Sequence, residues 1–170
     1  MELSNREIWA LVHGLLIGGP FLLAFTGALV SLAGLRSELL TPAGVRDRVR
    51  QLRIGAVVMA VMSGAIVLIG VWVLLPWYAE DTPDSPRSIL LSDPDTRQWH
   101  EFADVWKTHV AFLAPLLATA SAVVVVHYGR SLGRDRAARN LALGLLLGAF
   151  AVSSLAALIG SLVTRAAPLR

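Results

Sequence analysis

The sequence predicts an all-α fold, an integral-membrane four-helix bundle that forms a single domain over residues 1–170. Hydrophobic residues make up 55% of the chain and charged residues 16%, whereas soluble domains carry about 25% charged residues. Four apolar stretches also reach the roughly 20 residues that a helix needs to cross a bilayer. Helices are expected because open sheet edges cannot be satisfied in lipid. The expected spans are about 8–35, 54–77, 108–128 and 141–164.

The connecting segments differ in charge, and this difference predicts an orientation. Segment 35–53 holds five arginines and two acidic residues, and segment 128–140 holds four arginines and one acidic residue. The long loop 78–106 holds two arginines and seven acidic residues. The positive-inside rule places the arginine-rich connections in the cytoplasm. We therefore expect both termini and the acidic loop on the periplasmic or extracellular side.

Composition also excludes several function classes. The pI of about 10.2 is explained by arginines confined to short connections, which indicates membrane topology rather than nucleic-acid binding. The chain has no cysteine, which excludes disulfides, thiolate nucleophiles and iron–sulfur clusters. The first two spans contain no charged residue, so ion-coupled transport is disfavoured. Chemistry must come from histidine, carboxylates, methionine or a bound cofactor.

Local signals refine the helices. Ser4 and Glu7 have the spacing of a capping box, which predicts that a retained first helix begins near Asn5. Pro20 and Pro115 interrupt the first and third spans, and each frees the carbonyl four residues earlier.

Two further patterns concern packing. Glycines recur at a spacing of four residues in the first and fourth spans, at positions 14 and 18 and at positions 144 and 148, which predicts close helix contacts there. Aromatic residues at three- and four-residue spacing over 98–107 predict an amphipathic interfacial helix before the third span.

Two histidines are the main candidate site. His13 and His109 lie on the first and third spans and enter the membrane from the same outer face. A pair of imidazoles facing each other inside a helical bundle can hold one b-type haem near that face. Trp106 lies on the same helical stripe as His109, and Arg6 and Lys107 are placed to neutralise the haem propionates. We therefore predict haem b, with His13 and His109 as the metal ligands.

Other interpretations of these histidines stay open. Either ring can donate one interhelical hydrogen bond near the headgroups, and the pair can also belong to another metal site or a quinone site. His100 is expected to be a solvated surface residue, because it lies on the opposite helical face from His109.

The architecture resembles that of four-helix integral-membrane cytochrome b subunits, which anchor quinone-linked or periplasmic electron-transfer enzymes. The resemblance rests on four spans, on His13 and His109, and on the run from Trp99 to His109. Such subunits often hold two haems through four histidines, whereas only one pair matches here. The resemblance implies a bacterial inner-membrane protein within a larger respiratory or photosynthetic complex.

We therefore expect a membrane-embedded electron-transfer or anchor subunit rather than an enzyme acting alone. In this hypothesis it passes electrons between a quinol and an outer protein such as a basic cytochrome c, which the acidic loop attracts. A non-catalytic scaffold or assembly subunit is the alternative. A third possibility is a protein that handles lipids or small molecules through outer aromatic residues.

Overall fold

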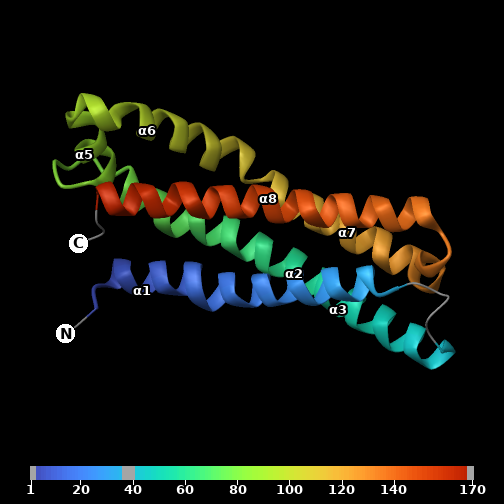
Figure 1. Ribbon diagram of the computed structural model, residues 1–170. Helices are drawn as coiled ribbons and strands as arrows, with labels where there is room; N and C mark the ends of the chain where they lie inside the picture. Colours follow the sequence, from blue (N-terminus) through green and yellow to red (C-terminus); the bar gives the residue numbers. More distant parts are fainter. Residues whose placement is uncertain (1–2, 36–40, 168–170) are drawn as a thin grey trace.

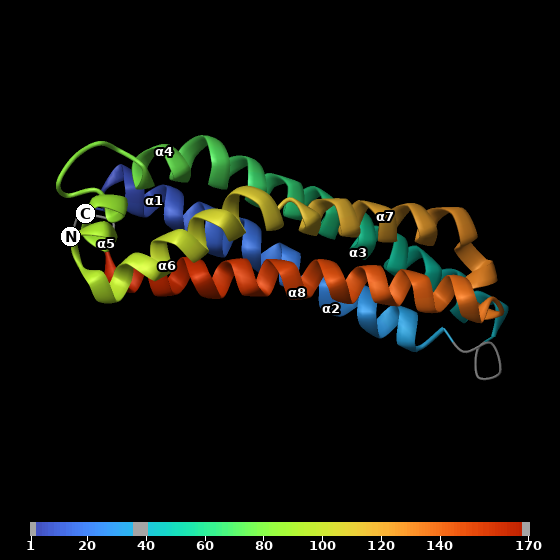
Figure 2. The same cartoon turned by 90° about the horizontal axis from the view of Figure 1, so that it is seen from above.

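The computed structural model describes residues 3–35 and 41–167, and every regular element within them is helical. This confirms the predicted all-α class. Four helices are long and apolar enough to cross a membrane, which confirms the predicted number of spans. They run side by side (Figures 1 and 2) and cover Asn5–Ala33, Pro42–Tyr78, Leu113–Gly133 and Arg136–Ala166.

The first long helix consists of α1 (Asn5–Leu11), the π-helical segment η1 (Val12–Ile17) and α2 (Gly18–Ala33). Its start is fixed as predicted. The Ser4 hydroxyl accepts from the Glu7 backbone N–H, and the Glu7 carboxylate accepts from the Ser4 N–H at 2.8 Å. These two bonds satisfy backbone donors that the first turn leaves free.

The second long helix comprises α3 (Pro42–Ile69), η3 (Gly70–Leu74) and α4 (Leu75–Tyr78). It begins well before residue 54, where the apolar stretch starts. The Thr41 hydroxyl caps the Gly44 N–H at 3.2 Å, and Pro42 occupies the first turn, where its missing N–H costs nothing. Residues 42–53 of the arginine-rich segment are therefore helical and extend the second span at one end.

The acidic loop contains α5 (Pro86–Ser92) and α6 (Pro94–Val105), and α6 leads through η4 (Trp106–Val110) into α7 (Leu113–Tyr128). The helix predicted over 98–107 thus lies in α6 and η4. Both views show α6 running beside α8 (Arg136–Ala166) and continuing toward α7 (Figures 1 and 2). A short 3-10 turn, η5 (Gly129–Gly133), joins α7 to α8.

The two ends of the molecule differ in composition. In Figure 1, α5 lies at the end where α1 begins and α8 ends, which we call the acidic end. The start of α3 and the turn η5 lie at the opposite end, which we call the arginine end. The two arginine-rich connections therefore lie at one end of the molecule, and the acidic loop lies at the other.

The main core lies where α2, α3, α7 and α8 pack together. A Cβ added to Gly55 would lie 3.0 Å from the Ala24 carbonyl oxygen and 3.1 Å from the Ala28 Cβ. A Cβ on Gly14 or Gly144 would meet no atom within 4 Å. Gly55 rather than Gly14 or Gly144 therefore lies against the backbone of a neighbouring helix. The glycine spacing did not identify it, because spacing does not reveal which helix face turns inward.

A smaller apolar cluster holds the acidic end together. It joins Leu90 of α5, Ala103 of α6 and Ile159 of α8, and Tyr78 and Trp106 pack against it. This cluster fixes α5, α6 and η4 against the last turns of α8. It thereby positions the segment that carries Trp106 and Lys107.

Candidate functional site

Three π-helical segments, η1, η3 and η4, interrupt the long helices toward the acidic end. A proline follows each segment, and a proline ring clashes with the carbonyl four residues earlier. A wider π turn relieves that clash and is frequent at functional sites. The three prolines and the carbonyls concerned are Pro20 with Leu16, Pro76 with Trp72, and Pro115 with Ala111.

His13 lies on η1 and rests against η3. Its Cε1 is 3.5 Å from the position that a Cβ would occupy on Gly70, so the ring packs directly on the neighbouring helix backbone. Within the described residues, the buried Nδ1 of His13 has no hydrogen-bond partner. Since buried polar atoms are nearly always paired, this atom is a candidate to bind a group from outside the chain.

Trp106 carries the second such atom. Its Nε1 is buried and lacks a hydrogen-bond partner in the part of the chain that the structure describes. The indole N–H can only donate, so its partner must be an acceptor. The Trp106 ring itself is held by the apolar cluster and by Phe102, whose ring centroid is 6.1 Å away.

Lys107 follows Trp106 in the sequence and lies close enough to His13 to act on it electrostatically. Its Nζ is 5.6 Å from the centroid of the Tyr78 ring, within the range of a cation–π contact. Burial lowers the pKa of Lys107 because the ammonium is removed from water. Its ammonium also acts electrostatically on the His13 ring.

A hydrogen bond extends this arrangement toward the surface. The Tyr78 hydroxyl and the His100 Nδ1 are 2.5 Å apart, and their rings stack with centroids 5.7 Å apart. His100, expected to be a solvated surface residue, is half-buried. His100, Tyr78, Lys107 and His13 together form a series of titratable groups from α6 to η1, which we call the polar row. The sequence did not predict the pairing of Tyr78 with His100. The two residues are 22 positions apart across the loop, and no pattern in the sequence indicates that residues so far apart are in contact.

The other predicted site residues are placed differently. Arg6 forms a 2.8 Å ion pair with Glu80, which ties the start of α1 to the residues after α4. His109 is exposed, and it lies two residues beyond Lys107 on the same segment, which places the two side chains on roughly opposite faces. Lys107, on the same segment, acts electrostatically on the His13 ring. Haem ligation by both imidazoles stays a prediction.

No group of three or more His, Cys, Asp or Glu side chains in residues 3–35 and 41–167 is placed to hold a metal ion.

Comparison with known proteins gives no relative. No family model, no curated protein and no solved structure matches the chain.

The chemistry of the site therefore follows from its residues. The Trp106 N–H and the Lys107 ammonium are donors, and His13 can donate from either ring nitrogen. Such a group of donors beside apolar helices would satisfy a carbonyl or anionic oxygen on an otherwise apolar ligand.

Proposed function

We propose that this protein is a multi-pass subunit of a larger membrane redox complex, and that its acidic end binds the head group of a quinone. The observation that carries the proposal is the pair of buried, unpartnered nitrogens, Nδ1 of His13 and Nε1 of Trp106, beside the partly buried Lys107. A quinone supplies carbonyl oxygens that accept hydrogen bonds. Its apolar tail stays in lipid, which suits a site built on membrane helices.

The polar row gives this site a route for protons. Oxidation of a quinol to a quinone releases two electrons and two protons. In this proposal, a redox centre of a partner subunit or an outer carrier accepts the electrons, and the polar row accepts the protons. The lowered pKa of Lys107 makes its ammonium readier to pass a proton on. The Tyr78–His100 hydrogen bond then leads toward the outer surface.

Haem b held by His13 and His109 is the alternative that the sequence predicts. A haem held by both rings has less support, because His109 is exposed while His13 packs on Gly70. Arg6, expected at a propionate, is paired with Glu80. These positions favour the quinone over the haem.

The two alternatives make different predictions for three variants. Titration of purified protein with decylubiquinone, or with a short-tailed menaquinone analogue, measures binding. His13→Ala and Trp106→Phe should each weaken binding about 2- to 10-fold, the usual contribution of one hydrogen bond. His109→Ala is the matched control and should bind as the original protein does. The absence of saturable binding of either quinone would overturn the proposal.

An absorption spectrum of the same protein, oxidised and reduced with dithionite, tests the haem. Soret and α bands that disappear in both His13→Ala and His109→Ala would replace the quinone with a haem at this end. Bands that survive both substitutions would exclude these two ligands.

We also propose that the helices form a membrane bundle with the acidic end and both termini outside. The positive-inside pattern supports this orientation, and the gathering of the arginine-rich segments at one end is consistent with it (Figure 1). Because the chain has no cysteine, single cysteines can report the topology. A membrane-impermeant maleimide should label Ser92→Cys in intact cells and should not label Ala137→Cys.

A scaffold role is the second candidate, and one observation favours it. In the four candidate spans, the buried share of the most apolar window is only 17% to 33%. The remaining apolar surface must be covered by lipid or by other subunits. A colourless protein that binds no quinone but remains bound to a larger assembly on purification would favour this role.

A further inference from the structure

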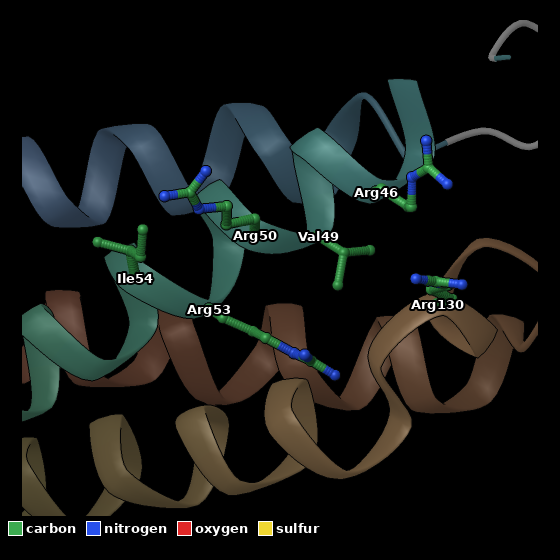
Figure 3. Close-up of a pocket in the computed structure, with 6 residues that line it drawn as sticks. All are labelled: Arg46, Val49, Arg50, Arg53, Ile54 and Arg130. Carbon is green, nitrogen blue, oxygen red and sulfur yellow. The ribbon is translucent and has the colours of Figure 1, made fainter. Parts of the chain in front are cut away.

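The first turns of α3 place several arginines beside one cavity. Arg46, Arg50 and Arg53 recur at four- and three-residue spacing, which brings them onto one side of the helix. Arg130 reaches the same cavity from η5. The cavity has a volume of about 250 Å³, and Val49 and Ile54 also line it, as Figure 3 shows.

A second cavity adjoins the first. It has a volume of about 470 Å³ and is also lined by Arg46 and Arg130. Arg134 and Ser131 of the α7–α8 connection are added to this lining. Two arginines therefore border both cavities, and further arginines lie on either side of them.

The electrostatics of these cavities are unbalanced. Among the described residues, no acidic side chain lines either cavity and no ion pair joins these arginines to a carboxylate. Arg53 Nη2 donates a hydrogen bond to the Val126 carbonyl at 3.3 Å. The arginines give both cavity linings an excess of positive charge, which a bound anion would balance. Planar guanidinium groups also match the oxygens of a phosphate.

The position of the cavities indicates a membrane lipid as the source of the anion. Ile54 is exposed, and the long apolar stretch of the second span begins there. On the other helix the cavities are lined by residues of η5, which forms the last turns of the third candidate span. A phosphate held here would lie at headgroup depth, with acyl chains free to run along the apolar helices.

We propose that the arginine end binds an anionic phospholipid whose two phosphates occupy the two adjoining cavities, which is the chemistry of cardiolipin. Arg46 and Arg130 line both cavities, Arg50 and Arg53 line the first, and Arg134 lines the second. Basic pockets between membrane helices on the cytoplasmic side are typical sites for such head groups. This proposal does not depend on the quinone site, which lies at the other end of the molecule.

Native mass spectrometry of the full chain tests the proposal. Delipidated protein is titrated with cardiolipin, phosphatidylglycerol or phosphatidylcholine, and the fraction of lipid-bound protein is measured. One cardiolipin per chain should bind at the lowest concentration, phosphatidylglycerol should bind more weakly, and phosphatidylcholine should not compete. Equal binding of cardiolipin and phosphatidylcholine would overturn the proposal.

Variants locate the bound lipid. Because one basic residue near an anionic surface is worth about fivefold in affinity, Arg46→Gln combined with Arg130→Gln should weaken cardiolipin binding about 25-fold. Arg136→Gln, an exposed arginine outside both cavity linings, is the matched control and should leave binding unchanged. If the double variant does not fold, Arg50→Gln alone should give about a fivefold loss. Equal effects of Arg50→Gln and Arg136→Gln would show that general charge, rather than this site, attracts the lipid.

Inorganic phosphate distinguishes a lipid from a soluble anion. Phosphate at millimolar concentration should not displace cardiolipin, because it lacks the second phosphate and the acyl chains. Displacement by phosphate would identify a soluble anion as the ligand and overturn the lipid assignment.

Discussion

Replacing Gly70 with leucine should disturb the quinone site although none of the side chains proposed to bind the quinone is itself replaced. The His13 Cε1 lies 3.5 Å from the Cβ position on Gly70, which is an ordinary contact distance. Alanine should therefore fit without displacement. The Cγ of leucine extends about 1.5 Å further, and directed at the ring it would approach within about 2 Å. The His13 ring must then move, and its Nδ1 loses its position beside Lys107.

The expected loss is about one hydrogen bond, or about 0.5–1.5 kcal/mol, which corresponds to a 2- to 10-fold increase in Kd for decylubiquinone. Calorimetric titration of the purified protein measures this change, and thermal unfolding in the same detergent checks that the variant is folded. Gly64→Leu is the matched control, because it lies on the same helix and a Cβ there would meet nothing within 4 Å. If Gly70→Leu binds the quinone as tightly as Gly64→Leu, the position of His13 does not determine binding and our reasoning is wrong.

Three further predictions concern stability. Gly55→Ala should destabilise the protein by about 1–3 kcal/mol in thermal or denaturant unfolding, because its new methyl group meets the backbone of α2. Gly64→Ala should be neutral or stabilising. Similar changes in the free energy of unfolding for both variants would contradict the packing argument. Gly129→Ala should lower the free energy of unfolding by about 1–3 kcal/mol, because Gly129 has φ 49° and a Cβ there would also crowd the Arg53 guanidinium. A variant of unchanged stability would show that the turn relaxes. Burial lowers the pKa of Lys107 in the folded state below its usual value of 10.5. At pH values between the folded-state pKa and 10.5, the unfolded state therefore binds more protons than the folded state. The free energy of unfolding should rise as pH increases through this range. Lys107→Met should reduce this rise in unfolding experiments, and an identical pH dependence would contradict the buried position of the ammonium.

The sequence was sufficient to predict the helical class, the number of spans and the start of the first helix. Long apolar stretches can satisfy their backbone in lipid only as helices, and the capping box at Ser4 and Glu7 depends on residues three positions apart. The arginine-rich extension of α3 was missed because hydropathy marks where a chain enters lipid, not where a helix begins. Its start is set by Thr41 and Pro42, which are local signals of a different kind.

The candidate site could be predicted only in part. His13, Trp106 and Lys107 stood out because polar groups are rare near apolar spans, and Lys107 lies close enough to His13 to act on it electrostatically. The pairing of His13 with His109 was inferred from similar depth, but depth leaves the rotation of each helix undetermined. The structure places His109 at the surface and Lys107 toward His13.

The sequence by itself determined which segments are apolar enough to enter a membrane and how charge is divided between their connections, because both properties depend only on the order of residues along the chain. The tertiary structure decided which side chains meet. It placed His13 against Gly70, joined Tyr78 to His100, and gathered Arg46 and Arg130 around shared cavities. Such contacts depend on the rotation and offset of helices that are distant in sequence, and packing across the whole molecule sets those two quantities.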